Sequence, residues 1–369
     1  MEPKRLKSSA EAWARVIIVN HNSGPLLQAC INALSLQTIS QFDTVIIDNA
    51  SSDGSAEALR LPDSRFRLHR AGANLGFAAA NNLGAADCGA DWIVTLNPDT
   101  VPGPTWLEEL RHATLRHPGA KMFGSTQIDA RKPGLVDGFG DVYSVFGTAW
   151  RGASGWPVAA LPPDDREVFA PCAAAALYTR EAFASAGGFD ESFFCYVEDV
   201  DLGFRLRLRG ERCIQVRRAE VRHYGAVSAK PDSDFFVFHS QRNRLWVLLK
   251  NVPSPLVWLT LALQIVVLPL TVLRRPPDKW RTALKGVMRV CAGSPRFGAN
   301  GARCKASAWC RAWTLPSCWS STRAKRFATP RISSRGRHAR RTCLRPQAMR
   351  DRRRASPRRR RWRGCVLLP

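Results

Sequence analysis

Along the first 130 residues, short apolar segments alternate with longer segments of helical periodicity. The apolar segments predict buried strands, at residues 15–20, 42–48, 65–69 and 91–97. Helices are expected between them, at residues 24–37, 77–87 and 104–117, with a short helix after the polar turn 49–55. One face of the first helix is apolar and carries Leu26, Leu27, Ile31 and Leu34. Strands that alternate with helices are typical of a parallel sheet in an α/β domain.

Beyond residue 130 the pattern is irregular before it becomes ordered again. Residues 131–168 are rich in Gly, Pro and Trp and predict loops with an irregular β element above the site. Later elements are expected as a strand at 171–179, a helix to Gly187, an acidic helix to Gly210, edge strands at 213–217 and 220–224, and a basic amphipathic helix at 239–251. The outer face of the acidic helix is expected to carry Arg205, Arg207 and Arg209.

Residues 252–273 form an uncharged apolar segment with basic residues on both sides. About 20 helical residues cross a bilayer core of ~30 Å, so the length suffices for a membrane span. Pro253, Pro255, Pro269 and Gln264 weaken that interpretation, and a hydrophobic helix packed on the domain explains the pattern equally well. We expect region 251–290 to associate with a membrane, in its plane or shallowly inserted.

The C-terminal region 291–369 differs in charge from the rest of the chain. It holds 22 of the 55 Lys and Arg residues and a single acid, so it carries +21 and leaves +4 for the first 290 residues. The charge of the whole chain therefore does not indicate a nucleic-acid partner. We expect the tail to be disordered.

Two interpretations of this tail stay open. Arginine outnumbers lysine there by 20 to 2, and six of the eleven cysteines fall in it. This composition favours a frameshift that begins near Val290, because basic arms usually contain lysine and few scattered Trp and Cys residues. The alternative is a genuine basic arm that contacts anionic lipid or RNA.

The remaining sequence predicts a location in the cytoplasm. The five cysteines before residue 291 show no metal-type spacing and indicate a reducing compartment. Residues 1–14 form a charged N-terminal extension without the features of a signal peptide. Together with the apolar segment, this predicts a protein associated with the inner face of the plasma membrane.

Polar side chains follow the predicted strands at their carboxyl ends, where ligands bind in open α/β sheets. Asp48 and Asp53 are placed to accept hydrogen bonds from a nucleobase and a ribose, although an Asx turn that caps the next helix would use the same residues. Gly76 permits a close backbone approach. The candidates for binding a nucleotide or a nucleotide-linked sugar, the donor of a group transfer, are Asp48, Asn49, Asp53, Asn74, Gly76, Asn82 and Asn97.

Acidic residues form two further candidate sites. Asp99, in a Leu-Asn-Pro-Asp turn, can supply one carboxylate to a hard divalent ion, although this turn and the strand-end His223 are each weak signals alone. Glu198, Asp199 and Asp201 repel one another at the start of a helix, a cost that the helix N-terminus offsets in part. An acidic helix cap is the alternative interpretation.

Together these motifs resemble the family-2 glycosyltransferases, in order and spacing, over roughly residues 15–250. The matching segments are IDNASSDGS, NLGFAAANN, LNPDT, GGFDESFFCYVEDVDLGFR and HYGAVS, of which LNPDT and FDESFFCYVEDVDL are similar to the rhamnosyltransferase branch. The resemblance implies a GT-A fold, an α/β fold in which a mostly parallel nucleotide-binding sheet is flanked by helices and merges with an acceptor-binding part. The nucleotide-binding half would cover residues 15–130 and the acceptor half residues 131–250, followed by the apolar helix.

The resemblance also implies roles for individual residues. Asp48 and Asp53 would bind the nucleoside, and Asp99 would bind Mg²⁺ or Mn²⁺ as the last residue of a DxD-type motif whose first position is Asn97. Asp199 would be the general base with Glu198 beside it, and His223 would hold the metal or the leaving diphosphate. The acceptor would contact Asp190, Glu191 and Asp201.

The expected reaction is inverting transfer of a sugar, rhamnose in this branch, from a nucleoside-diphosphate donor. The acceptor is a saccharide or a polyprenyl-linked saccharide of the cell surface or cell wall. One base suffices for such a displacement, without a protein nucleophile. One alternative is a sugar nucleotidyltransferase, which needs a Gly-rich basic phosphate loop where this chain has NHNSGP. An inactive, membrane-associated scaffold with the same fold is the other alternative.

Overall fold

The computed structural model describes residues 12–225 and 233–292. The predictions for residues 1–11 and for the tail from residue 293 lie outside this part of the chain. The first half of the fold contains β1 (Ala14–Asn20), α1 (Pro25–Ser35), β2 (Phe42–Asp48), β3 (Phe66–Arg70), α2 (Gly76–Ala85), β4 (Trp92–Leu96), β5 (Thr100–Pro102), α3 (Trp106–Arg116) and β6 (Ala120–Asp129).

The second half contains smaller elements and ends in three helices. They are β7 (Val136–Gly138), β8 (Asp141–Tyr143), β9 (Ala149–Arg151), η1 (Val158–Ala160), β10 (Arg166–Val168), β11 (Ala175–Thr179), α4 (Arg180–Ser185), η2 (Glu191–Phe193), α5 (Glu198–Arg207), β12 (Arg212–His223), α6 (Asp234–Asn251), α7 (Leu256–Leu273), η3 (Pro277–Lys279) and α8 (Trp280–Ala292).

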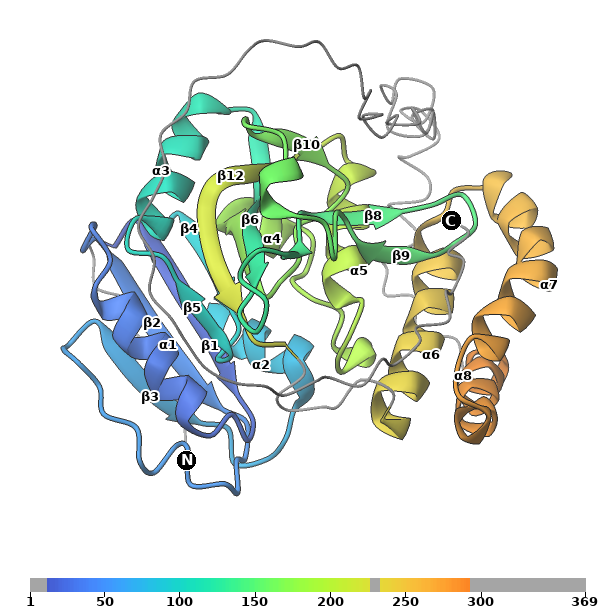
Figure 1. Cartoon of the computed structure of the whole chain (residues 1–369), viewed down its shortest axis with the longest axis horizontal. Coiled ribbons are helices and arrows are strands. Elements are labelled where there is room, and N and C mark those ends of the chain that lie inside the picture. The colour runs from blue at the N-terminus through green and yellow to red at the C-terminus, as the bar shows by residue number, and fades with distance from the viewer. Residues whose placement is uncertain (1–11, 226–232, 293–369) are drawn as a thin grey trace, which may run out of the picture. The chain divides into compact units, whose positions relative to one another are not determined.

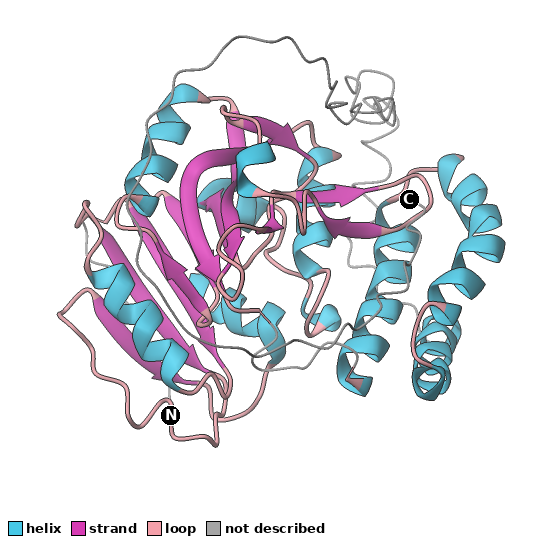
Figure 2. Ribbon diagram, viewed as in Figure 1, coloured by secondary structure: helices cyan, strands magenta, loops and turns pink. Residues whose placement is uncertain are grey.

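A ten-stranded sheet forms the centre of the fold, with its main strand order β10-β12-β6-β11-β4-β1-β2-β3. Strands β1 to β4 pair in parallel, and β6 pairs in parallel with β12. In the register of β1 and β2, Asn20 lies beside Asp48, so both strands end at the same edge. The predicted α/β architecture with a mostly parallel sheet is confirmed (Figure 2).

Helices cover both faces of the sheet (Figure 1). Alternate β1 residues point to opposite faces: Val16 and Ile18 pack with α1 and α3, whereas Ile17 and Val19 pack with α2, α4 and α5. Both sets are buried, which explains why β1 is a continuous apolar segment with no polar alternation.

Three expectations about this part of the chain were wrong, and one strand was not foreseen. The two expected edge strands are one strand, β12 (Arg212–His223), which lies between β6 and β10 and is no edge. Strand β6 was not expected, and the short helix expected after residue 55 is a series of turns. Arg205 and Arg207 are buried, because the surrounding segments supply carbonyl and carboxylate partners for them.

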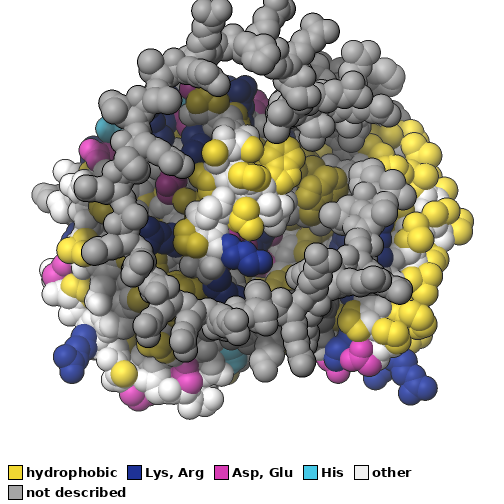
Figure 3. All heavy atoms as spheres, viewed as in Figure 1, with side chains coloured by type: hydrophobic (Ala, Val, Ile, Leu, Met, Phe, Trp, Pro, Cys, Tyr) yellow, Lys and Arg dark blue, Asp and Glu magenta, His cyan; other side chains and the backbone are white. Residues whose placement is uncertain are grey.

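The C-terminal helices form a layer beside the sheet domain, with α6 against α5 and α8 against α6. The polar side chains of α7, Thr260 and Gln264, are buried against the rest of the protein, whereas apolar ones such as Trp258 and Ile265 are exposed. The edge formed by α7 is therefore a hydrophobic surface (Figure 3). Among the described residues, α7 alone is long and apolar enough to cross a membrane.

Candidate active site

A cavity of about 380 Å³ lies between the end of β4, the β8–β9 hairpin, the start of α5 and helix α6. Asn97, which follows β4, contributes to its wall together with Glu198 and Asp199 from the first turn of α5. The structure thus brings the turn after the fourth strand and the acidic helix start into one cavity. The remaining polar groups in the wall include Asp141, Arg151, Cys172, Ser240, Gln241, Arg244 and Arg275.

Asp199 is held by the backbone in a fixed orientation. Its Oδ2 accepts a hydrogen bond from the Ala173 N–H at 3.0 Å, and its Oδ1 accepts one from the Val200 N–H at 2.8 Å. Burial raises the pKa of this carboxyl above its ordinary value, although these two hydrogen bonds and Arg151 oppose the shift. A carboxylate of raised pKa is a stronger proton acceptor than an exposed aspartate.

Two other acids surround Asp199. A carboxylate oxygen of Asp141 lies within 4.8 Å of one of Asp199. Burial and the charge of Asp199 raise the pKa of Asp141 well above its ordinary value, and the same two causes act on Glu198. The Oε2 atom of Glu198 is buried without a hydrogen-bond partner among the described residues. Burial therefore raises the pKa of all three acids, and in Asp199 the two backbone hydrogen bonds and Arg151 oppose the shift.

The segment before α5 has an unusual backbone. Phe194, Tyr196 and Val197 have φ angles of 65°, 72° and 70°, in the left-handed region that β-branched residues such as Val rarely adopt. Gly76, at φ 81°, permits this segment to lie close, since a Cβ at Gly76 would stand 2.6 Å from Phe194 atoms. The start of the acidic helix is thus fixed by a close contact with the NLGF turn.

His223 connects Asp99 with the β7 and β9 strands. Its Nε2 lies 3.3 Å from the Asp99 Oδ1, and its Nδ1 lies 2.7 Å from the Asp137 Oδ2. Asp137 also accepts a hydrogen bond from Arg151, which lines the cavity. Burial lowers the pKa of His223, but the two carboxylates outweigh it and raise the pKa above the ordinary value.

The groups around Asp99 fit a divalent metal ion. Asp99 supplies a carboxylate, and the Asn97 Oδ1 is buried without a partner among the described residues. The His223 Nε2 faces Asp99 and its Nδ1 faces Asp137, so a metal ion bound at Nε2 would replace the proton that Asp99 favours there. A second group, Asp141, Cys172 and Asp199, also has ligand atoms close together. It fits less well, because burial raises the pKa of the Cys172 thiol to about 12 and metal ligands must lose their protons.

The ends of β1 and β2 form a separate polar rim. The Asn20 amide donates to Asp48, and the Asn49 amide donates to Asn74. Asp53 accepts hydrogen bonds from the Gly24 N–H and from the N–H and hydroxyl of Ser55. Burial raises the pKa of Asp53, but these hydrogen bonds together outweigh it and lower the pKa below its ordinary value. The rim is therefore ordered by its own hydrogen bonds.

Of the fourteen predicted site residues, only Asn97, Glu198 and Asp199 line the cavity, so Asp99, His223 and the residues of the rim lie outside its wall, as do four others. Asn82 donates to the Phe189 carbonyl and to Glu191, and so holds the loop before η2. Asp201 is fully buried and is paired with Arg205 and Lys250, and Lys250 also pairs with Asp190. Asp190, Glu191 and Asp201 thus connect α2, η2, α5 and α6.

Sequence patterns did not identify several cavity residues. Asp141 and Arg151, and Asp137 which contacts His223 outside the cavity, come from the irregular region 131–168. That region was expected to lie above the site but offered no spacing rule for its acids. Arg244 was recognised only as one charge of a basic helix. No sequence signal distinguished it from Arg242 two residues earlier.

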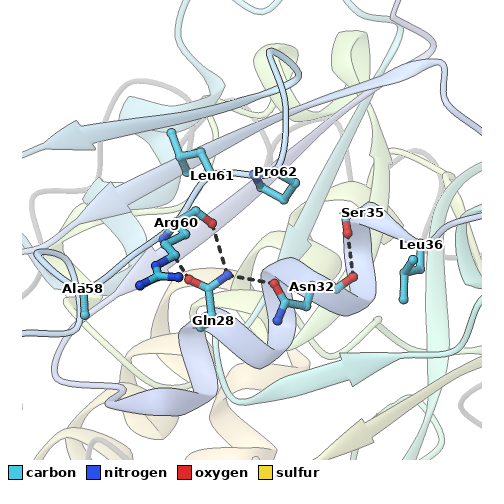
Figure 4. Close-up of a pocket in the computed structure, with 8 residues that line it drawn as sticks. All are labelled: Gln28, Asn32, Ser35, Leu36, Ala58, Arg60, Leu61 and Pro62. Carbon is cyan, nitrogen blue, oxygen red and sulfur yellow. Dashed lines mark hydrogen bonds between the residues drawn. The ribbon is translucent and has the colours of Figure 1, made fainter.

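A second hollow lies between α1 and residues 58–62 (Figure 4). Its wall is tied together by Gln28, whose amide donates to Asn32 and to the Arg60 carbonyl. The residues that line it include no carboxylate and no histidine. This hollow lacks the groups that a proton transfer requires.

Comparisons with known proteins agree with this geometry. The family model described as glycosyl transferase family 2 matches residues 15–133. The chain is 35% identical over 241 residues to N-acetylglucosaminyl-diphospho-decaprenol L-rhamnosyltransferase from Mycobacterium tuberculosis, a match that covers 59% of this chain and 78% of that protein. It is 28% identical over 244 residues to the O-antigen biosynthesis protein RfbC of Myxococcus xanthus, covering 61% of this chain and 18% of that protein.

A solved structure has the same fold. GalNAc-T7, crystallised with UDP, GalNAc and Mn²⁺, superimposes with a TM-score of 0.53 at 15% identity. The match covers 65% of this chain and 48% of that chain, so it spans about half of the larger protein. At this identity the likeness concerns the fold alone.

Proposed function

This chain belongs to the family-2 glycosyltransferases, and on that basis we propose that it transfers rhamnose from a nucleoside-diphosphate donor to an N-acetylglucosaminyl-diphospho-polyprenol in cell-wall polysaccharide synthesis. The mycobacterial relative supports the donor sugar and the acceptor class, since the match covers most of its length. That the protein is a glycosyltransferase follows from the family.

One observation carries the proposal: the turn after β4 and the base candidate Asp199 lie on one cavity. The rim at Asp48 and Asp53, beyond the ends of β1 and β2, is the proposed nucleoside site. In this arrangement the donor extends from the rim toward Asn97 and places its anomeric carbon in the cavity. The acceptor enters from the side of α6.

The proposed reaction is a single displacement with Asp199 as the base. The acceptor hydroxyl gives its proton to Asp199 while its oxygen bonds to the anomeric carbon. The bond from that carbon to the nucleoside diphosphate breaks in the same step, so the configuration inverts. Asp141 and Glu198 remain protonated next to Asp199, which keeps a single negative charge at this point.

Mg²⁺ or Mn²⁺ is the proposed cofactor. Asp99 and His223 would hold it, with the Asn97 amide oxygen directed to the same region. When bound, such an ion stabilises the negative charge of the leaving diphosphate. Asp137 and Arg151 would keep the His223 ring in one orientation.

A position at the inner face of the plasma membrane is part of the proposal. Helix α7 exposes apolar side chains to the outside, among them Trp258, Ile265 and Val266. Basic residues flank this surface beyond its C-terminal end, at Lys279, Arg281 and Lys285, and they complement anionic lipid headgroups. We propose that α7 lies in the membrane surface, where a polyprenyl-linked acceptor is embedded.

A transfer assay with the purified full chain tests the function. The donor is dTDP-rhamnose, and the acceptor is N-acetylglucosaminyl diphosphate linked to a short prenyl chain, with Mn²⁺ or Mg²⁺. The expected product is a disaccharide on the prenyl diphosphate, detected by mass spectrometry. Transfer from UDP- or GDP-sugars in place of dTDP-rhamnose would contradict the proposed donor, and no product with any donor would contradict the function.

A further inference from the structure

The wall of the cavity has a cationic part next to the C-terminal helices. Arg244 of α6 and Arg275, which follows α7, both line it, together with Ser240, Gln241 and Phe236. The guanidinium of Arg275 lies 5.5 Å from the ring centroid of Phe236. The same cavity is therefore lined both by the acids of α5 and by these two arginines.

Arg242 and Arg244 are two residues apart on α6 but have different surroundings. The Arg242 guanidinium donates to the carbonyls of Ser192 and Phe193 and stacks over the Trp246 ring at 4.2 Å, so it holds η2 in place. The Arg244 Nη2 donates to the Thr271 hydroxyl at 3.1 Å. Its Nε is buried and has no partner among the described residues.

A buried guanidinium that has no carboxylate partner lowers the stability of a protein, unless a bound anion pairs with its charge. Burial and the nearby charge of Arg275 lower the pKa of Arg244 to about 10, while Tyr143 opposes the shift. Arg244 thus remains protonated at neutral pH in a poorly solvated position. A planar guanidinium with an open N–H edge fits phosphate oxygens, which can accept two parallel hydrogen bonds.

We propose that Arg244 and Arg275 bind the diphosphate of the isoprenoid-linked acceptor. The proposal rests on the proposed function and assigns a second phosphate site, distinct from that of the nucleotide donor near Asp99. Arg275 is the second residue after α7, the helix that exposes its apolar face. A diphosphate at this point would have its sugar on the side of Asp199 and its lipid on the side of α7.

The experiment measures binding of two diphosphates by isothermal titration calorimetry, with the full chain and Mg²⁺. Farnesyl diphosphate represents the acceptor, and dTDP represents the donor. The variants are Arg244→Gln and Arg275→Gln, and the matched control is Arg274→Gln, because Arg274 is exposed and does not line the cavity. Circular dichroism melting confirms that each variant folds, and Arg244→Lys serves as a second variant that keeps the charge.

We expect both cavity variants to bind farnesyl diphosphate about tenfold more weakly or worse, the usual effect of losing a charged hydrogen bond. The dTDP affinity should stay unchanged in all variants, and Arg274→Gln should match the wild type for both ligands. Unchanged farnesyl diphosphate binding in Arg244→Gln would overturn the proposal. A loss of dTDP binding of equal size would also overturn it, since the arginines would then bind the donor.

The sugar-transfer assay separates this inference from the proposed function. If the wild type transfers the sugar but both variants bind farnesyl diphosphate as tightly as the wild type, the diphosphate site is wrong and the proposed function stands. If farnesyl diphosphate binding depends on the two arginines but the wild type transfers no sugar, the proposed function is wrong and the diphosphate site stands.

Discussion

The rim at the ends of β1 and β2 and the cavity at α5 differ in how their polar groups are partnered. The rim at the ends of β1 and β2 is held by neutral and carboxylate hydrogen bonds, since Asn20 donates to Asp48 and the Asp53 carboxylate accepts three hydrogen bonds, and its unpartnered atoms are neutral ones such as the Asn20 Oδ1. In the cavity at α5, ionisable groups have buried atoms without partners among the described residues, such as the Glu198 Oε2 and the Arg244 Nε.

This contrast suggests a division of tasks, in which the rim binds the nucleotide and the cavity carries out the sugar transfer. A rim with its own hydrogen bonds is preorganised and can bind a nucleotide without rearrangement. Buried acids of raised pKa and left-handed backbone at Tyr196 and Val197 cost stability, and such features persist where they serve a reaction. The changes below test this contrast by removing one feature at a time.

Replacing Asp199 by Asn should have the largest effect. Loss of a general base lowers kcat by about 10²–10⁴-fold, while the distant rim continues to bind the donor. Steady-state kinetics and calorimetry with the donor nucleotide measure the two quantities in one preparation. Asp164→Asn is the control, because Asp164 is exposed. Wild-type turnover in Asp199→Asn would remove this residue from the mechanism.

Replacing Asp201 should lower the stability of the protein. Asp201→Ala leaves Lys250 and Arg205 buried without their shared carboxylate, so we expect a loss of about 3–5 kcal/mol in the free energy of unfolding. Urea denaturation measures it, with Asp164→Ala as a control that should change stability by less than about 0.5 kcal/mol. A stable Asp201→Ala protein with weakened acceptor binding would restore the role in acceptor binding that the sequence suggested.

Gly76 and Gly72 form a matched pair. Both have positive φ angles, 81° and 77°, but a Cβ at Gly76 would meet Phe194 whereas one at Gly72 meets nothing within 4 Å. Gly72→Ala should cost only the backbone strain of about 1 kcal/mol, and Gly76→Ala a further 1–3 kcal/mol or so from the contact. Thermal unfolding compares them. Equal losses would mean that the 194–197 segment does not depend on this contact.

Asp141→Asn should have the smallest effect on turnover. Because burial and the Asp199 charge raise the pKa of Asp141 and so favour its neutral form, a neutral amide should replace it with a fall in kcat at neutral pH of less than about tenfold. The pH profile of kcat should fall on the acid side through a pKa above the usual 3.8, since Asp199 must lose its proton to accept another. A loss as large as that of Asp199→Asn would make Asp141 the base.

The sequence predicted the sheet domain well where periodicity is strong. Strands β1 to β4 and helices α1 to α3 lie within two residues of their expected ends, because each buries a regular apolar face. The acid pair of α5 and the Asn-Pro-Asp turn were found from motifs. The position of β12 inside the sheet was missed because its partner β6 carries polar residues such as Ser125, Thr126 and Gln127, which are buried by pairing.

Tertiary contacts determine the remaining site residues. Asp190 and Asp201 sit in the same acidic motif as Asp199, and only the position of Lys250, about 50 residues later, shows that they pair with a cation. Asp141 reaches Asp199 through a hairpin that sequence spacing cannot locate. The membrane association of α7 stays a prediction.

A structure with a non-hydrolysable phosphonate analogue of the donor and Mn²⁺ tests the central claim most directly. The account predicts the nucleoside at the rim near Asp48 and the anomeric carbon inside the cavity, between Asn97 and Asp199. A donor sugar outside that cavity, for example in the hollow between α1 and residues 58–62, would contradict it.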